Sequence, residues 1–297
     1  MELNNCNCFI LYLIKIMVKF SIITINYNNK NGLRKTIESV IHQNFNSFEF
    51  IVIDGGSTDG SFEIIQEYKQ YIDYWVSEPD QGIYNAMNKG VAKAQGKYCN
   101  FMNSGDCFVD NNVLNHIFTS EKQADIICGN TYLTKWIKPP KEITLDYLFN
   151  STICHQCAFI NRRLLLKYKY DEKLKIVADR KLFLQSLILE NCSYQAIDVN
   201  IVIYDLNGFS SHNRVLSDLE YQQVLEELIP ERIRIDYGKK YKGILYGDTD
   251  YEKLFFEIGQ RKYRDYIYTI VAFLMRIIAL FVRSAKFIKL YPLKLRK

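Results

Sequence analysis

Carboxylate and amide side chains gather in three short turns, and each turn directly follows a short apolar run. The turns cover residues 54–60, 78–82 and 103–106. A single Asp after a strand is usually the N-cap of the next helix, so any one turn has a structural explanation. If the three turns meet at one end of a parallel sheet, their carboxylates can instead bind a divalent cation. Such a cation would suit a substrate that carries a diphosphate.

The apolar runs around these turns predict the elements that position them. Short runs rich in β-branched and aromatic residues predict buried parallel strands at 20–25, 50–53, 74–77 and 97–102. Apolar stripes with helical spacing predict helices within 33–41, 62–72 and 83–94, and Gly96 would close the last helix in the left-handed conformation. This alternation predicts an α/β fold with a mostly parallel central sheet, helices on both faces, and ligands beyond the carboxyl ends of the strands.

The alternation becomes less regular after residue 110. Helices are predicted at 113–118, 179–190 and 213–229, and strands at 126–132, 153–160 and 197–204. No change in composition marks a domain boundary before about residue 210.

Length and composition exclude several classes of protein. Of the 297 residues, 48% are hydrophobic and 24% charged, so the chain is neither disordered nor collagen-like. A net charge of +5 is too small to indicate a nucleic-acid partner. The eight Cys are irregularly spaced, which favours free thiols in a reducing cytosol. Cys154 and Cys157 flank His155, but a structural zinc site needs four ligands, so we interpret this spacing as coincidence.

Four motifs are specific when taken together. They are Ser-Ile-Ile-Thr at 21–24, Thr-Ile-Glu-Ser-Val at 36–40 with Gln43, Ile-Asp-Gly-Gly-Ser-Thr-Asp-Gly at 53–60, and Asp-Gln-Gly-Ile-Tyr-Asn-Ala-Met-Asn at 80–88. With these motifs the chain resembles the inverting family 2 glycosyltransferases of the GT-A fold, which build polysaccharides from nucleotide sugars. The resemblance implies a catalytic domain over residues 19–212, with a nucleotide-sugar half at 19–110 and an acceptor half at 111–212.

The resemblance also implies how the donor is bound. Asn26 and Tyr27 would lie against the nucleotide, with Tyr27 either a stacking platform or a half-buried loop aromatic. Asp54 would accept a hydrogen bond from the base. Asp80 and Gly82 would lie near the ribose and the donor sugar, because glycine lets backbone approach closely.

Asn103, Ser104, Gly105 and Asp106 occupy the place of the family's acidic metal-binding triplet. Only Asp106 is acidic, which departs from the usual pattern. Asn103 and Ser104 are therefore expected to contact the substrate. Asp106, two diphosphate oxygens and water would hold Mg²⁺ or Mn²⁺.

The implied reaction is a displacement at the anomeric carbon, in which the acceptor hydroxyl must lose a proton. Asp179 matches the family's late catalytic Asp and would accept this proton; the alternative is a structural N-cap. His155 is expected either to face the acceptor or to be a core or loop histidine. Asp146, His212 and Arg214 are weaker candidates for site residues, and the loop beside His212 can close over the donor in relatives.

The two ends of the chain lie outside the resemblance. Residues 1–18 form an N-terminal extension without a signal-peptide pattern, and translation could begin at Met17. A helical extension is predicted at 213–260. Residues 261–297 carry ten basic side chains against Asp265 and include the apolar run 266–282. This run is short for a spanning helix, so it is expected to lie on an anionic membrane surface, or else to pack on the catalytic domain or on a dimer partner.

Together with the basic segment, the resemblance implies a cytoplasmic, peripheral membrane enzyme of cell-surface polysaccharide synthesis, such as capsule or O-antigen assembly. It would transfer a sugar from a nucleotide sugar, with a UDP-sugar favoured, to a glycan or lipid-linked glycan. A nucleotidyltransferase-like enzyme would need a basic Gly-rich loop after the first strand, and a nicotinamide dehydrogenase would need Gly-x-Gly-x-x-Gly there; neither occurs. A catalytically inactive scaffold of the same fold is the remaining alternative.

Overall fold

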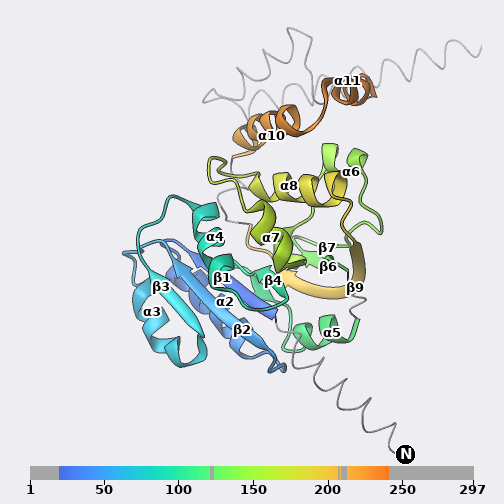
Figure 1. The fold of residues 1–297 in the computed structure, drawn as a ribbon. Coiled ribbons are helices and arrows are strands. Elements are labelled where there is room, and N and C mark those ends of the chain that lie inside the picture. Colours follow the sequence, from blue (N-terminus) through green and yellow to red (C-terminus); the bar gives the residue numbers. More distant parts are fainter. Residues whose placement is uncertain (1–19, 121–123, 207, 209–212, 241–297) are drawn as a thin grey trace, which may run out of the picture. The chain divides into compact units, whose positions relative to one another are not determined.

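The computed structural model describes residues 20–120, 124–206, 208 and 213–240. This part of the chain contains a nine-stranded sheet in the order β3-β2-β1-β4-β8-β6-β9-β5, with β7 paired to β6 (Figure 1). The described chain divides after Ile229 into two units. The sheet and the helices up to α10 belong to the first unit, and α11 (Glu231–Lys240) belongs to the second.

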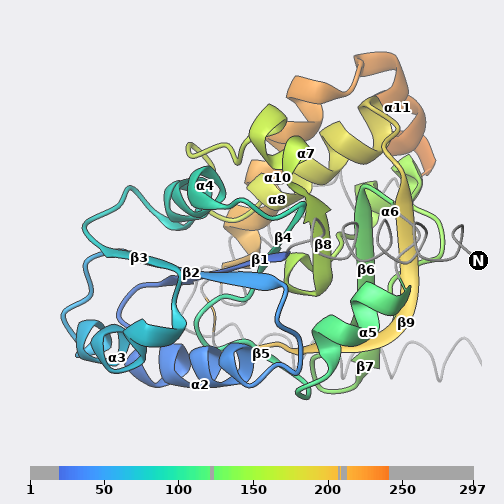
Figure 2. The same ribbon diagram turned by 60° about the horizontal axis from the view of Figure 1, so that its bottom comes forward.

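The first half of the sheet is parallel. Its strands are β1 (Phe20–Asn26), β2 (Phe48–Asp54), β3 (Tyr74–Ser77) and β4 (Tyr98–Phe101). The helices between them are α2 (Lys30–Ile41), α3 (Ser61–Tyr68), which η1 (Lys69–Tyr71) continues, and α4 (Ile83–Lys93). Figure 2 shows α2 and α3 on one face of these strands and α4 on the other. The parallel strands and helices predicted for this half are confirmed.

The second half of the sheet is mixed, so the expectation of a mostly parallel sheet is wrong there. Its strands are β5 (Cys107–Phe108), β6 (Ile126–Tyr132), β7 (Trp136–Ile137), β8 (Ala158–Asn161) and β9 (Tyr194–Ile203). β8 runs antiparallel to both β4 and β6, and β5 runs antiparallel to β9. Because β8 is inserted between β4 and β6, the carboxyl ends of β4, β6 and β9 still lie at the same edge.

Seven helical segments accompany the strands of the second half in the described residues. They are α5 (Val113–Ser120), α6 (Leu145–Asn150), η2 (His155–Cys157), α7 (Arg162–Tyr168), α8 (Ala178–Phe183), η3 (Leu184–Leu189) and α10 (Arg214–Leu228). The strand predicted at 153–160 is extended only at its end, because residues 155–157 form a 3₁₀ turn. The helix predicted at 179–190 continues from α8 into a π-helix.

Gly96 does not cap α4, which corrects the expected left-handed turn. The helix ends at Lys93, and Ala94 is its C-cap. The N–H of Gly96 instead donates to Ser21 Oγ and to the buried Glu49 carboxylate. These bonds connect the turn after α4 to β1 and β2.

An aromatic contact joins the two halves of the core. Phe20 of β1 and Phe159 of β8 are both fully buried, and their rings meet edge to face with 5.3 Å between centroids. Such a pair stabilises by about 0.5–1.5 kcal/mol beyond its buried area. The strands on either side of β4 are therefore held in a fixed relation.

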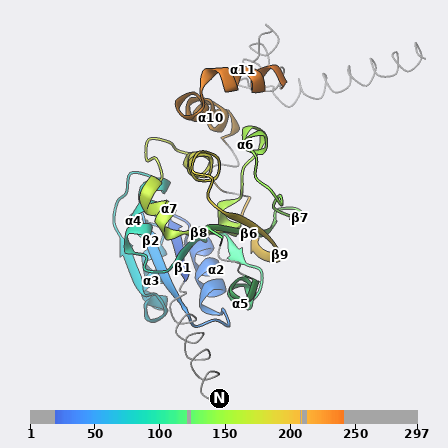
Figure 3. The ribbon, with the colours of Figure 1, turned by 45° about the vertical axis from the view of Figure 1, so that its right-hand side comes forward.

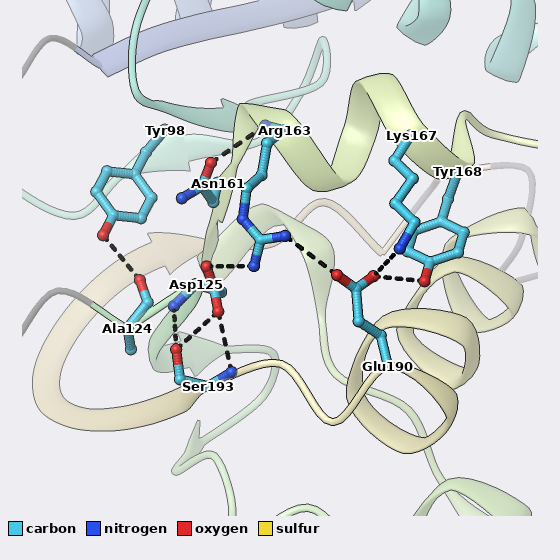
Figure 4. A network of polar contacts seen from close by, with 9 residues as sticks. All are labelled: Tyr98, Ala124, Asp125, Asn161, Arg163, Lys167, Tyr168, Glu190 and Ser193. Carbon is cyan, nitrogen blue, oxygen red and sulfur yellow. Dashed lines mark hydrogen bonds and ion pairs between the residues drawn. The ribbon is translucent and has the colours of Figure 1, made fainter.

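A polar network closes the amino end of the sheet, opposite the acidic turns (Figure 4). Arg163 forms ion pairs with Asp125, just before β6, and with Glu190, just after η3. Lys167 and Tyr168 also bond Glu190. The network connects α7 to the start of β6 and to the end of η3.

Within the described residues, no helix is long and apolar enough to cross a membrane. The extension at 1–18 and the basic segment at 261–297, with its apolar run, lie outside the described residues.

Candidate active site

Asp54 is the structural centre of the first acidic turn. It lies opposite Asn26 on β1 and Ser77 on β3 in the strand register, and it is fully buried. Its carboxylate accepts hydrogen bonds from Asn26 Nδ2, Ser57 N, Ser57 Oγ and Ser77 Oγ at 2.6–3.0 Å. Burial acts to raise the pKa of Asp54, but these hydrogen bonds lower it overall. Asp54 thus holds the ends of three strands and the following turn together.

Tyr27 and Asp80 converge over Gly55. The Tyr27 side chain is exposed, at 68% for the residue. A Cβ at Gly55 would lie 2.6 Å from Asp80 Oδ2 and 3.2 Å from Tyr27 Cδ2, so only glycine leaves room for both side chains. Gly82, with φ of +117°, donates its N–H to Asp80 Oδ1 at 2.8 Å. An exposed ring beside a carboxylate is an arrangement that can receive a nucleoside.

The loop 103–106 continues from β4 beside β1. Ser104 N donates to Ile25 O, and Thr36 Oγ1 accepts from Gly105 N and donates to Asp106 O. Asp106 is buried, with Oδ1 accepting from Asp205 N at 2.7 Å and Oδ2 from Gln156 Nε2 at 3.1 Å. Burial raises the pKa of Asp106 to about 6, despite these two hydrogen bonds.

Asp205 joins this loop, although the sequence analysis did not single it out. A Cβ at Gly105 would lie 2.5 Å from Asp205 Oδ2, so the Asp205 carboxylate rests against the backbone beside Asp106. Its position in the sequence could have identified it, because Asp205 follows the predicted strand 197–204 just as the other acidic residues follow their strands.

The oxygen donors in this loop have the chemistry that a hard cation requires. The Asp106 carboxylate accepts from Asp205 N, and the Asp205 carboxylate lies against Gly105. Mg²⁺ or Mn²⁺ can complete its shell with substrate and water oxygens. Among the described residues there is no group of three His, Cys, Asp or Glu side chains that could hold a metal by itself. The donor set fits a cation held jointly by protein and diphosphate.

His155 connects Asp179 to Asn103. His155 Nδ1 lies 3.0 Å from Asp179 Oδ2, and Nε2 lies 3.2 Å from Asn103 Nδ2. The two contacts favour the neutral tautomer with the proton on Nδ1. Burial acts to lower the pKa of His155, but the Asp179 hydrogen bond and charge, with Cys154 and Asp106, raise it overall. His155 therefore lies against Asp179 in the interior of the site.

The segment before Asp179 is held by polar side chains of α4. Tyr84 donates its hydroxyl to Ile176 O at 2.5 Å. Asn88 donates to Tyr170 O and accepts from Tyr170 N, both at 2.9 Å. Asn85 and Asn88 both donate to Glu172. These residues belong to the motif 80–88, and their contacts lead from the Asp80 turn to the Asp179 segment.

The remaining candidates lie on later elements of the chain or outside the described residues. Asp146 lies in the first turn of α6, and Arg214 is the first residue of α10. His212 lies outside the described residues. Cys157 Sγ lies 3.3 Å from Cys128 Sγ in the core and donates to Cys154 O, so these thiols have structural partners.

Comparisons with known proteins identify the family of this chain. Residues 21–179 match the family model described as glycosyl transferase family 2. An uncharacterized glycosyltransferase of Mycobacterium tuberculosis is 28% identical over 258 residues, covering 79% of this chain and 95% of the relative. A Mycobacterium bovis protein named as a PGL/p-HBAD biosynthesis glycosyltransferase is 26% identical and covers 68% of this chain and 82% of its own.

Two solved structures share the fold. Staphylococcus aureus TarS with UDP-GlcNAc superposes with a TM-score of 0.57 at 20% identity, covering 70% of this chain and 64% of that one. The mannosyltransferase PcManGT of Pyrobaculum calidifontis, with GDP-Man and Mn²⁺, gives 0.55 at 13% identity, covering 70% and 63%. This chain thus spans less than two thirds of either solved chain.

The chain belongs to glycosyl transferase family 2. Its mixed, curled sheet with flanking helices is consistent with the GT-A fold, and the chain is a glycosyltransferase.

Proposed function

We propose that this glycosyltransferase moves a sugar from a nucleotide diphosphate sugar to an acceptor hydroxyl with inversion, using Asp179 as the base. One observation carries the proposal. Two successive residues of η2 bond the two carboxylates of the site: Gln156 donates to Asp106, and His155 bonds Asp179. The carboxylate suited to the diphosphate and the carboxylate suited to the acceptor are thereby held by the same turn.

The donor would bind over the parallel half of the sheet. Tyr27 offers its exposed face to the base, and the Asp80 carboxylate beside it can accept a hydrogen bond from a hydroxyl of the ribose or sugar. Asp106 and Asp205 would hold Mg²⁺ or Mn²⁺, which when bound neutralises charge on the departing diphosphate. We favour a UDP-sugar, and the UDP-GlcNAc bound to TarS supports a UDP-sugar in this fold.

Asp179 would take the proton from the acceptor hydroxyl. His155 donates its Nδ1 proton to Asp179 Oδ2, which orients the carboxylate, while Oδ1 accepts from the N–H of Arg180. A carboxylate oxygen has two lone pairs, so a hydroxyl that approaches Oδ1 can transfer its proton as its oxygen attacks the anomeric carbon from the face opposite the diphosphate. That attack inverts the anomeric configuration.

The acceptor would be a glycan or lipid-linked glycan of cell-surface polysaccharide synthesis. The basic segment 261–297 would hold the enzyme on the cytoplasmic face of the membrane, where ten basic side chains favour anionic lipid.

The proposal is tested by thermal-shift binding of UDP, GDP, dTDP and CMP, with and without Mn²⁺. A native-state ligand at one hundred times its Kd raises stability by about 2.7 kcal/mol. We expect a shift with one nucleotide that requires both Mn²⁺ and Asp106, and that Asp106→Ala removes. Asp179→Asn should keep this shift and lose sugar transfer. No shift with any nucleotide would favour a scaffold that has lost activity.

A further inference from the structure

A buried carboxylate on α10 binds the backbone just before Asp179. Glu220 is only 7% exposed. Its Oε1 accepts from Lys175 N at 2.8 Å, and its Oε2 accepts from Ile176 N at 2.9 Å and Val177 N at 3.3 Å. Three successive N–H groups thus point at one side chain from another helix, 43–45 residues later in the chain.

The residues after Asp179 are held by the same helix. The Arg180 guanidinium lies 3.3 Å from the centroid of the Tyr221 ring. Lys181 Nζ forms ion pairs of 2.7 Å with Glu227 and 2.8 Å with Asp171. Asp179 is therefore flanked on both sides by residues that α10 fixes. Figure 1 shows α10 beside α8, and Figure 3 shows α10 next to α6.

The contacts satisfy groups that the local sequence leaves without partners. Val177 is the N-cap of α8, and its side chain cannot cap the helix. The first N–H groups of a helix and of the turn before it need an acceptor. A carboxylate is a strong acceptor for such groups, and its charge favours the helix N-terminus. The acceptor comes from α10, which lies after the family match at 21–179.

We propose that Glu220 is a positioning residue that sets the place of the base, so that α10 is part of the catalytic unit. The inference rests on the proposed role of Asp179. Through the backbone at 175–177, Glu220 fixes the first turn of α8 and with it the distance from Asp179 to His155. Without Glu220, the three N–H groups would donate to water instead. Asp179 would then move away from the acceptor and from His155.

The test uses the full chain with Glu220→Ala and Glu220→Gln. The Gln variant keeps the shape and one acceptor oxygen but sets an amide N–H against the backbone N–H groups. Asp218→Asn removes an exposed carboxylate from the same helix and is the matched control. Asp179→Asn is the reference for a lost base, and His155→Gln assigns the His155 signal among four histidines.

The first readout needs no substrate. The titration of the His155 ring by NMR reports its contact with Asp179, and Asp179→Asn should lower the pKa of His155. We expect both Glu220 variants to shift this titration toward that of Asp179→Asn, and Asp218→Asn to match the wild type. Hydrogen exchange of the amides at 175–177 should also become faster in the Glu220 variants only.

The second readout is turnover with the nucleotide sugar that thermal shift identifies. We expect the Glu220 variants to lower kcat by about tenfold or more, because a displacement of about 1 Å can cost up to about a hundredfold. The KM for the donor should stay within about twofold, since Glu220 acts on the segment of the base and not on Tyr27 or Asp80. A folded Glu220→Gln with wild-type titration, exchange and kcat would overturn the proposal.

The two proposals fail in different ways. If Asp179→Asn retains full transfer, the role of Asp179 as base is wrong, whatever the Glu220 variants do. If Asp179→Asn is inactive while Glu220→Gln and Glu220→Ala transfer normally, only the positioning role is wrong. If Glu220→Ala does not fold, the comparison of Glu220→Gln with Asp218→Asn decides.

Discussion

Replacing Asp106 with asparagine should make the protein without bound ligand more stable at neutral pH while removing metal-dependent nucleotide binding. Burial raises the pKa of Asp106 from its ordinary value of 3.8 to about 6. Between these values the folded chain holds a proton that the unfolded chain has released. The free energy of unfolding therefore falls as pH rises through this range, and the stability present below 3.8 is lost above about 6.

The size of the effect follows from the shift. A change of about 2 pKa units corresponds to about 3 kcal/mol between the acid and the neutral limit. Between pH 4.5 and 8 about 2 kcal/mol of this is realised, because part of the unfolded carboxyl has already ionised at about pH 4.5. The amide introduced by Asp106→Asn does not titrate, so the variant should gain this amount relative to the wild type over that range.

The assay is thermal or urea unfolding of both proteins at about pH 4.5 and pH 8. For a domain of this size, we expect the Tm difference between the variant and the wild type to rise by about 4–8 °C from the lower to the higher pH. Asp110→Asn, which removes an exposed carboxylate nearby, controls for the change in net charge. Saturating Mn²⁺ with the identified nucleotide should reverse the order at pH 8, because only the wild type binds the cation. Parallel pH curves for Asp106→Asn and wild type would refute the reasoning.

Three further predictions concern other parts of the molecule. Tyr27→Ala should weaken binding of the identified nucleotide by about 1–3 kcal/mol in calorimetry, while Tyr27→Phe keeps the stacking surface and most of the affinity. Gly105→Ala should lower Tm and abolish the Mn²⁺-dependent binding of the nucleotide, because its φ is +107° and its Cβ would lie 2.5 Å from Asp205 Oδ2; Mn²⁺-dependent binding equal to that of the wild type would contradict the shared site. Phe159→Ala should cost about 3–5 kcal/mol in urea unfolding, and a loss below about 1 kcal/mol would show that its contact with Phe20 does not join the two halves.

The parallel half of the fold could be predicted because its signals are local. Each strand of this half is a short, mostly apolar run, and each helix follows within a few residues with its own apolar stripe. The position of the acidic turns then follows from parallel pairing alone, since Asn26, Asp54 and Ser77 share one register. What the pattern could not show is that Asp54 would be fully buried, with donors from β1, from β3 and from the turn that follows β2.

The second half could not be predicted to the same depth because its order depends on contacts distant in sequence. The apolar run at 153–160 predicts one strand, but Gln156 turns to bond Asp106, and Asn100 donates to both Gln156 O and Ala158 O, which stabilises a 3₁₀ turn. Asp205 reaches the same loop from the end of β9, about a hundred residues after Asp106. No local periodicity carries that information.

The resemblance identifies the motif at 80–88, but it does not show what each residue of the motif does. Its first residues, Asp80 to Gly82, lie where a donor would be expected, but Tyr84 and Asn88 have a different purpose: they hold the segment that carries Asp179. If the donor binds at Asp80 and Asp179 is the base, as proposed, α4 connects the two substrate positions, because one end of α4 lies at the Asp80 turn and its side chains bond the segment before Asp179. Glu220 of α10 bonds the same segment, so the proposed base is held by two helices, one before it and one after it in the sequence. A change in either helix should therefore affect the rate of sugar transfer more than the affinity for the donor. A change at Tyr27 should affect the affinity for the donor more than the rate of transfer.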